Sequence, residues 1–243
     1  MTSYQLVLLA GGRATRLGAL AKDVPKVLQP VAGRPFLYHL MEHAAAGGIT
    51  DVHLCLGHLG ARVEEHVGRL ADLTGLRFTT SGETAPAGTA GALVGALDQL
   101  ADTFVVGMGD TYIDLDWPAV AGRLPSTAPA MMVVTGRPSG PPPNVLVRDG
   151  LVTAYDKRGI AGAWTDTGVA VLRKEALFPL RGHSVPCDLA SLFDPLIGRG
   201  DLAALPVDIR FYDIGTPERI EEIERRHFGA LSSEGRGGRS HGG

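Results

Sequence analysis

Cationic side chains follow a short apolar run near the N-terminus of this chain of 243 residues. The run at residues 5–10 stops at Gly11-Gly12, and Arg13, Arg16 and Lys26 come before the chain becomes apolar again. Adjacent glycines can take positive φ and approach a ligand closely, so consecutive backbone N–H groups can point at phosphate oxygens. Arginine and lysine add positive charge. We therefore expect a strand that leads into an anion-binding loop.

The spacing in this loop fits neither of two common phosphate loops, G-x-x-x-x-G-K-[ST] and G-x-G-x-x-G. Three motifs follow one another instead: G-G-x-x-T-R-L at residues 11–17, P-K-x-L-x-P-V at 25–31 and G-R-P at 33–35. In this order they resemble the signature of the sugar-1-phosphate nucleotidylyltransferases. The alternative is an ordinary glycine-rich turn with solvated charges.

The resemblance implies a reaction dominated by negative charge. Such enzymes join a nucleoside triphosphate to a sugar-1-phosphate by in-line attack on the α-phosphorus, and pyrophosphate leaves. Catalysis then depends on positioned cations and Mg²⁺ rather than on a covalent nucleophile. By resemblance, Arg16, Lys26 and Asp110 are catalytic. The implied nucleotide-binding residues are Leu9, Ala10, Gly11, Gly12, Arg13, Thr15, Arg16, Lys26, Glu83, Gly88, Thr89 and Asp110.

Two aspartates resemble the metal-binding aspartates of this family. Mg²⁺ prefers hard oxygen ligands and commonly binds one or two carboxylates together with phosphates and water. Asp110 and Asp213 each follow an expected strand. Their alternative roles are a turn residue at a strand end for Asp110 and a helix cap for Asp213. The resemblance nevertheless implies that both bind Mg²⁺.

The implied sugar-phosphate site departs from the family pattern. Lys157 lies where relatives have Glu-Lys-Pro, but Asp156 and Arg158 flank it, and residues 166–168 read Asp-Thr-Gly where relatives have Asn-Ala-Gly. An exposed hairpin lysine is the alternative for Lys157. The implied sugar-phosphate-binding residues are Gly109, Asn144, Asp156, Lys157, Thr167 and Gly168.

Strands and helices must alternate to position these residues. Hydrophobic periodicity predicts strands at residues 5–10, 51–56, 76–80 and 103–107, and helices at 35–46, 59–70 and 87–100. This alternation favours an α/β fold with a Rossmann-like, mostly parallel sheet flanked by helices. Ligands of such sheets bind at the carboxyl ends of the strands, where Gly11-Gly12 and Asp110 are expected.

The second half of the chain no longer shows the regular alternation of strands and helices. Asp149-Gly150 between two extended runs predicts a hairpin with a type I′ turn. We then expect a strand at 164–172, a helix at 188–196, a strand at 203–208 and a helix at 217–228. Thr216 is expected to cap this last helix. The resemblance implies a small β-rich sugar-binding lobe on a GT-A-like nucleotidyltransferase fold.

We therefore expect one domain over residues 1–230. Residues 1–125 would bind the nucleotide, 126–215 the sugar phosphate, and 216–230 would form the C-terminal helix. Residues 231–243 contain too little apolar surface to fold, so a disordered tail is expected.

Composition limits the partners. The chain is 44% hydrophobic and 20% charged, with a net charge of −3, so nothing favours nucleic acid or an anionic membrane as a partner. Without an apolar leader or spanning run, we expect a cytoplasmic protein. Cys55 and Cys187 lack metal-site spacing and are expected to be buried, reduced thiols. A homodimer remains open.

Two other functions stay open. Asp114-Leu115-Asp116 is a D-x-D motif, which is typical of metal-dependent glycosyltransferases that consume nucleotide sugars, although two acids before Trp117 also suit a helix start. A catalytically inactive regulatory protein on the same fold is the other alternative. For the base, residues 4–110 and YDIGTPER are similar to the branch with heptose-1-phosphate and mannose-1-phosphate guanylyltransferases, so we expect GTP, with ATP, CTP, UTP and dTTP as alternatives.

Overall fold

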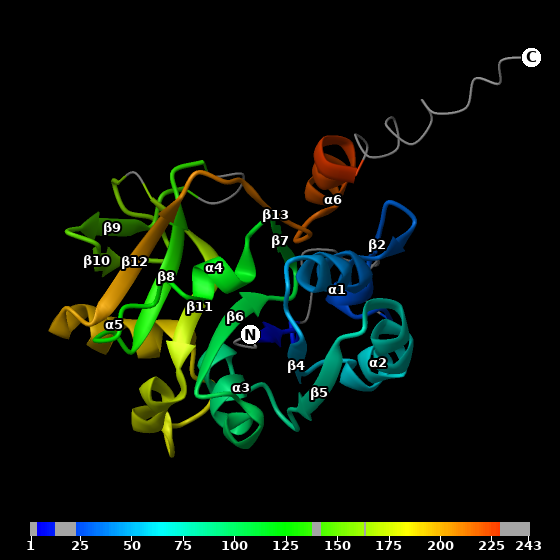
Figure 1. Ribbon diagram of the computed structural model, residues 1–243, viewed down its shortest axis with the longest axis horizontal. Helices are drawn as coiled ribbons and strands as arrows, with labels where there is room; N and C mark the ends of the chain where they lie inside the picture. Colours follow the sequence, from blue (N-terminus) through cyan, green and yellow to red (C-terminus); the bar gives the residue numbers. More distant parts are fainter. Residues whose placement is uncertain (1–3, 13–22, 138–141, 163, 229–243) are drawn as a thin grey trace, which may run out of the picture.

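The protein is built around one central sheet (Figure 1). The computed structural model describes residues 4–12, 23–137, 142–162 and 164–228. In their order across the sheet the strands are β5 (Arg77–Gly82), β4 (Asp51–Leu56), β1 (Gln5–Leu9), β6 (Thr103–Met108), β11 (Thr165–Arg173), β8 (Ala130–Thr135), β12 (Leu202–Val207), β10 (Leu151–Tyr155) and β9 (Val145–Arg148).

The first four strands of this order are parallel, as the sequence predicts. Strand β1 lies between β4 and β6, and its last residue, Leu9, is in register with both Cys55 and Met108. The backbone N–H of Gly109 donates to the carbonyl oxygen of Leu9 at 3.0 Å. The glycine loop after β1 and the turn after β6 therefore leave the sheet side by side.

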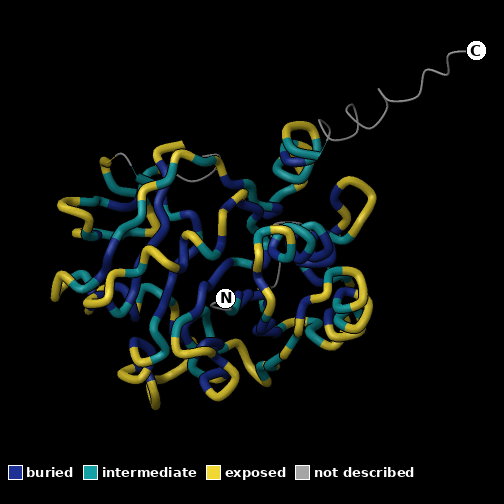
Figure 2. Tube along the Cα trace, in the orientation of Figure 1, coloured by how far each residue is buried: buried dark blue, intermediate teal, exposed yellow. Residues whose placement is uncertain are grey.

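Helices cover both faces of the sheet. On one face lie α1 (Phe36–Ala46), α2 (Gly60–Thr74), α4 (Trp117–Ala121) and α6 (Pro217–Ile223); on the other lie α3 (Thr89–Gly95), α5 (Leu189–Arg199) and the 3₁₀ segment η4 (Lys174–Leu180). Side chains of β1 alternate between them: Leu6 and Leu8 join the first core, and Val7 and Leu9 join the second. Buried segments accordingly fill the centre of Figure 2.

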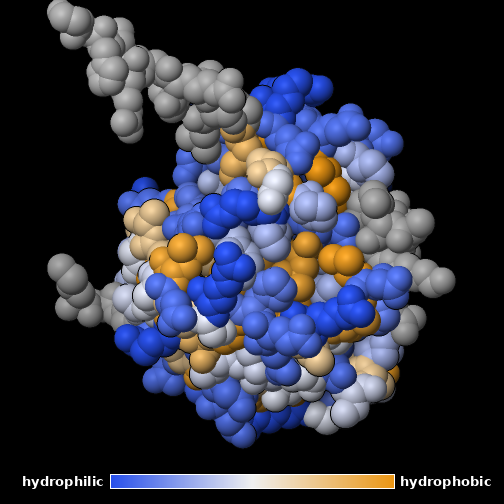
Figure 3. Space-filling view, turned by 90° about the vertical axis from the view of Figure 1, so that its right-hand side faces the viewer, coloured by the Kyte–Doolittle hydropathy of each residue, from blue (hydrophilic) through white to orange (hydrophobic). Residues whose placement is uncertain are grey.

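The face that carries α2 is mostly hydrophilic. Along α2 only Val63 and Leu70 are buried, and its other positions are partly or fully exposed. Figure 3, which views the right-hand side of Figure 1, shows hydrophobic groups scattered among hydrophilic ones. None of the described helices combines the length and the apolar character that crossing a membrane requires.

The β-rich second half continues the same sheet. Strand β11 runs antiparallel to both β6 and β8, β12 runs parallel to β8, and the hairpin of β9 and β10 forms the edge. Asp149 has φ 51° and Gly150 has φ 76°, the two positive values that a type I′ turn requires. The predicted turn is confirmed.

Three short elements complete the arrangement around the ends of β1 and β6. They are the 3₁₀ turn η2 (Lys26–Leu28), the small hairpin of β2 (Pro30–Val31) and β3 (Arg34–Pro35), and the pair of β7 (Thr111–Ile113) with β13 (Phe211–Asp213). The β7–β13 pair joins segments that are 100 residues apart. It brings the end of the chain back to the turn after β6.

Two predicted helices are less regular than expected. The helix expected at 87–100 is α3 followed by the 3₁₀ turn η3 (Leu97–Gln99), and its start is delayed because Gly88 has φ 78°. The final helix is α6 followed by a π-helical turn, η5 (Glu224–Phe228). Thr216 stands at the N-cap position, but within the described chain its side chain makes no capping hydrogen bond. The expected tail at 231–243 lies outside the described residues.

Candidate active site

The first cavity opens at the carboxyl ends of β1 and β6 and has a volume of about 230 Å³. Nine residues expected to bind the nucleotide line it: Leu9, Ala10, Gly11, Gly12, Lys26, Glu83, Gly88, Thr89 and Asp110. Its other lining residues are Val27, Cys55, Pro86, Ala92, Met108 and Asp188. The remaining expected nucleotide contacts, Arg13, Thr15 and Arg16, lie outside the described residues.

A second cavity of about 430 Å³ adjoins the first. Its lining includes Asn144, Lys157, Thr167 and Gly168, four of the residues expected to bind the sugar phosphate. The two cavities share Thr89, Met108 and Asp110. Asp110 therefore faces both spaces, so one carboxylate can act on ligands in each.

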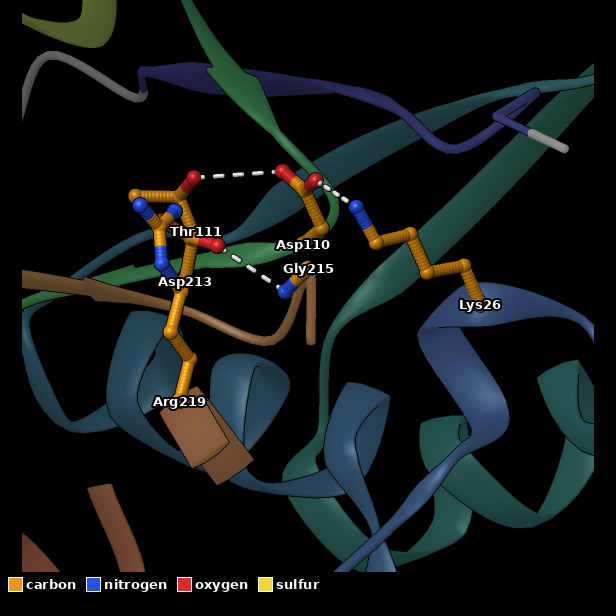
Figure 4. A network of polar contacts seen from close by, with 6 residues as sticks. All are labelled: Lys26, Asp110, Thr111, Asp213, Gly215 and Arg219. Carbon is orange, nitrogen blue, oxygen red and sulfur yellow. Dashed lines mark hydrogen bonds and ion pairs between the residues drawn. The ribbon is translucent and has the colours of Figure 1, made fainter. Parts of the chain in front are cut away.

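Lys26, from the lining of the first cavity, forms an ion pair with Asp110 (Figure 4). The side chains are 11% and 25% exposed, so both are shielded but still in contact with cavity space. The second carboxylate oxygen of Asp110 accepts a hydrogen bond from the Thr111 hydroxyl at 3.2 Å. Lys26 is held in place by the η2 turn, where Leu28 N–H donates to the Pro25 carbonyl.

Asp213 is brought next to Asp110 by the pairing of β13 with β7. The register places Asp213 opposite Thr111, and the backbone N–H of Ile214 donates to the carbonyl oxygen of Asp110 at 3.0 Å. Asp213 itself accepts from the Gly215 N–H at 2.9 Å, and it forms an ion pair with Arg219 from α6 (Figure 4). Both aspartates thus face the second cavity, each with a cation beside it.

This donor set fits Mg²⁺. Two carboxylates on neighbouring strand ends are the number that a Mg²⁺ ion commonly takes from protein, and phosphates and water fill its other positions. Among the described residues, no group of three or more His, Cys, Asp or Glu side chains could hold a metal ion without such help. Asp110 and Asp213 would therefore hold Mg²⁺ jointly with a phosphate ligand.

A second ion pair links the two cavities. Lys157, in the loop after β10, contacts Asp188, the N-cap residue of α5, at 3.0 Å. Lys157 lines the second cavity and Asp188 the first. The hydrogen bond from Lys157 lowers the pKa of the Asp188 carboxyl. Lys157 is therefore anchored between the cavities, although its side chain is 53% exposed.

The loop before α3 is fixed by residues from much later in the chain. The carbonyl oxygen of Cys187 accepts hydrogen bonds from the N–H groups of Ala90 and Gly91, and Leu189 N–H donates to the Thr89 hydroxyl at 2.8 Å. A Cβ atom on Gly88 would lie 2.5 Å from the Cys187 carbonyl oxygen. Only glycine fits there, so the wall of the first cavity depends on this close backbone approach.

Two expected sugar-phosphate contacts lie outside the lining of the second cavity. Gly109 packs under the glycine loop, where an added Cβ would lie 2.9 Å from the Val27 side chain. Asp156 pairs with Arg158 on the surface. The first provides a close approach between the β1 and β6 ends, and the second closes the turn after β10.

Several lining residues were not expected to belong to the site. They are Tyr155, Phe193, Phe211 and Arg219 in the second cavity, and Cys55, Met108 and Asp188 along the first. Asp166 lines the second cavity beside Thr167 and Gly168, although the sequence marked it only as a departure from the family pattern. The position of Asp166 near one end of a predicted strand could have indicated that it lines the site. Arg219 could not be recognised in this way, because its sequence context is that of any arginine on the surface of a helix.

The D-x-D motif has a structural explanation. The carboxylate of Asp116 accepts a hydrogen bond from the Ala119 N–H at 3.0 Å and caps α4. Asp114 is 72% exposed and faces His43. Neither aspartate is part of the lining of the two cavities. Cys55 and Cys187 are free and buried.

Comparison with known proteins identifies the family and the fold. Residues 5–144, more than half of the chain, match the family model described as nucleotidyl transferase. The chain belongs to the nucleotidyl transferase family, the sugar-1-phosphate nucleotidylyltransferases, as the motifs at residues 11–35 predict. The fold prediction is likewise confirmed by similarity to solved nucleotidyltransferase structures.

Two curated relatives illustrate the range. The chain is 33% identical over 179 residues to the CMP-5'-(3-aminopropyl)phosphonate synthase of Streptomyces rubellomurinus. This match covers 72% of this chain and 28% of the synthase. It is 32% identical over 112 residues to a D-glycero-alpha-D-manno-heptose 1-phosphate guanylyltransferase of Campylobacter jejuni. That match covers 46% of this chain and 50% of the guanylyltransferase. The chain thus spans between about a quarter and a half of these curated relatives.

Among solved structures, HddC from Yersinia pseudotuberculosis superposes with a TM-score of 0.78 at 25% identity, covering 92% of this chain and 99% of that one. HddC has also been solved in complex with GMP-PN. The likeness to HddC extends beyond residue 144, where the family model ends.

Proposed function

We propose that this protein joins a nucleoside triphosphate to a sugar-1-phosphate, giving a nucleoside diphosphate sugar and pyrophosphate. The observation that carries the proposal is the pair of adjoining cavities with Asp110 in their shared wall. One cavity is lined by the glycine loop, and the other by Lys157 and Arg219. Two anionic substrates would thus meet where cations and carboxylates converge.

The residues divide the work by position. Gly11 and Gly12 offer backbone N–H groups to the triphosphate, and Arg13, Thr15 and Arg16 would extend this contact. Lys26, beside Asp110, would neutralise the α-phosphate and the attacking phosphate.

Bound Mg²⁺ would offset further negative charge on the phosphates. Asp110 and Asp213 would hold the ion. Lys157 and Arg219 would orient the acceptor phosphate from the other side of the second cavity. An oxygen of that phosphate forms a bond to the α-phosphorus, the bond to the bridging oxygen breaks, and pyrophosphate departs.

GTP is the first choice of nucleotide, and a heptose- or hexose-1-phosphate is the first choice of acceptor. The support is the likeness to guanylyltransferases of heptose-1-phosphate and mannose-1-phosphate, and to HddC, which has been crystallised with GMP-PN. The Glu83 carboxylate and the loop around Gly88 line the cavity that would hold the nucleoside.

Cytidylyl transfer to a phosphonate is the second candidate. The 179-residue match to the Streptomyces phosphonate synthase is too long to lie within residues 1–125. It must extend into the part of the chain that lines the second cavity, where the acceptor would bind. A phosphonate oxygen could attack the α-phosphorus in the same way as a phosphate oxygen.

Pyrophosphate release tests these proposals directly. The full chain with Mg²⁺ is supplied with GTP, CTP, ATP, UTP or dTTP against a panel of heptose-, mannose- and glucose-1-phosphate and 3-aminopropylphosphonate. We expect release with GTP and an aldose-1-phosphate, and its loss in Lys26→Ala and Asp110→Ala. Release with CTP and the phosphonate alone would favour the second candidate.

Two outcomes would contradict the assignment. A glycosyltransferase or an inactive regulatory protein would release no pyrophosphate from any pair of substrates. Turnover at the wild-type rate in both variants would refute the roles of Lys26 and Asp110, because Asp110 lines both cavities and Lys26 lines the first and pairs with Asp110.

A further inference from the structure

Asp166 differs from the other acidic residues of the second cavity because, in the part of the chain that the structure describes, no lysine or arginine forms an ion pair with it. Asp110 and Asp213 are both ion-paired. Within the described chain, Asp166 forms no ion pair: Oδ1 accepts from the Gly168 backbone N–H at 2.8 Å, and Oδ2 accepts from the Tyr155 hydroxyl at 3.2 Å. Among the described residues, this carboxylate of the lining therefore has no cation in direct contact, and Lys157 acts on it only from a distance.

The backbone fixes where this carboxylate lies. The N–H of Asp166 donates to the Asn144 side-chain oxygen at 2.8 Å, and Asp166 is in register with Val134 of β8. Gly168, two residues on, has φ 76° and turns its N–H toward the carboxylate. Asp166 is thus a rigid, pre-oriented acceptor on the cavity wall.

Its surroundings disfavour the negative charge. Burial raises the pKa of the Asp166 carboxyl, whereas the hydrogen bonds from Gly168 and Tyr155 and the charge of Lys157 act in the opposite direction. Taking a carboxylate out of water without a cationic partner is costly. A ligand that supplied a positive charge at this point would offset that cost.

Aromatic rings stand beside the carboxylate. Tyr155, which donates to Asp166, lies with its ring centroid 6.1 Å from that of Phe193 at an interplanar angle of 79°. Both rings line the second cavity. Aromatic faces attract ammonium groups, and a carboxylate gives them a charge-assisted hydrogen bond. The combination favours an organic cation over a neutral hydroxyl.

We propose that the second cavity selects acceptors bearing an ammonium group, which binds to the Asp166 carboxylate beside Tyr155 and Phe193. The inference rests on the proposed function in one respect, that this cavity holds the acceptor. It goes further by naming an amino-substituted phosphate as the substrate class. A neutral hydroxyl would be served equally well by an amide oxygen and would leave the charge of Asp166 uncompensated.

Equilibrium binding without nucleotide tests the inference apart from catalysis. Isothermal titration calorimetry at pH 7.0 compares glucosamine 1-phosphate and 6-amino-6-deoxyglucose 1-phosphate with glucose 1-phosphate, on the full chain. We expect at least one amino ligand to bind about tenfold or more tightly than glucose 1-phosphate, the gain typical of a hydrogen bond to a charged group. N-acetylglucosamine 1-phosphate, which keeps the nitrogen but loses its charge, should lose the advantage.

Two variants locate the effect. Asp166→Asn keeps the shape and removes the charge, and it should bring the ratio of amino to hydroxyl affinity close to one. Asp194→Asn is the matched control, because Asp194 is exposed on α5 next to Phe193 and is absent from the cavity lining. It should leave the ratio at the wild-type value.

The inference is wrong if neither amino ligand binds more tightly than glucose 1-phosphate to the wild-type protein. Equal changes of the ratio in both variants would also refute it, since a general field effect would then explain the preference. If Asp166→Asn failed to fold, the comparison of the two amino ligands with glucose 1-phosphate on the wild-type protein would still decide. Binding without pyrophosphate release would contradict only the proposed function.

Discussion

The two cavities are built in different ways. The first is lined largely by backbone and small residues from continuous motifs, above all residues 9–12 and 86–89, and Lys26 is the cation among its described lining residues. The second is lined by side chains from β7, β10, β11, α5, β13 and α6. A triphosphate can be held by N–H groups that short motifs present, whereas a particular acceptor must be recognised by side chains. The first cavity therefore suits a shared chemistry, and the second an individual specificity.

Substitutions of the ion pair between Lys26 and Asp110 should have the largest effect on activity. Lys26→Ala and Asp110→Ala should each lower kcat about 10³-fold, because the charge at the transferred phosphate is then uncompensated. Pyrophosphate release under saturating substrates measures this. Lys174→Ala, on η4 and outside both cavities, serves as the control. Substantial retention of kcat in either variant would refute a shared catalytic wall.

Lys157→Ala should separate the two cavities. We expect KM for the acceptor to rise about 10- to 100-fold, as for the loss of a charged hydrogen bond, while KM for the nucleoside triphosphate changes little. Initial rates with each substrate varied in turn provide the comparison. Equal increases in both KM values would mean that the Lys157–Asp188 pair supports both cavities and does not serve the acceptor alone.

Gly88→Ala should damage the first cavity alone. The new Cβ would clash with the Cys187 carbonyl, and φ 78° is unfavourable for alanine, so we expect a loss of about 1–3 kcal/mol in the free energy of unfolding and a raised KM for the nucleotide. Chemical denaturation and initial rates measure these. Gly95→Ala is the matched control, because Gly95 ends α3 with nothing within 4 Å of an added Cβ, and it should be neutral or stabilising.

The smallest expected effect is on the free energy of unfolding, which the charge of Asp166 in the second cavity should lower. The folded state raises the pKa of Asp166 above its ordinary value of about 4, so ionisation costs stability as pH rises through the interval between the two values. Asp166→Asn should therefore be more stable than wild type by about 1 kcal/mol at neutral pH and no more stable below pH 4. Thermal unfolding between pH 4 and 7.5 measures this. A variant that is less stable than wild type at pH 7.5 would contradict the expected sign.

Much of the fold could be predicted from local pattern. The strands at 51–56 and 103–107, the helix that ends at Gly47 and the Asp149-Gly150 turn agree with the structure because each depends on neighbouring residues. The shortened α3 differs because Gly88 is held by Cys187, a contact across about 100 residues that no local pattern reveals.

The sequence by itself determined the family of this protein, because the motifs at residues 11–35 combine particular residue types at fixed spacing. It also named the glycine loop, Lys26, Asp110 and Asp213 as candidates for the proposed phosphate transfer. Only the tertiary structure decided how the second cavity is closed. Pairing of β13 with β7 brings Asp213 and Arg219 back to Asp110, and the sheet register sets Asp166 beside Tyr155. Such contacts join residues whose types are common and whose separation in the chain follows no fixed spacing. Their proximity can therefore be recognised only in the folded structure.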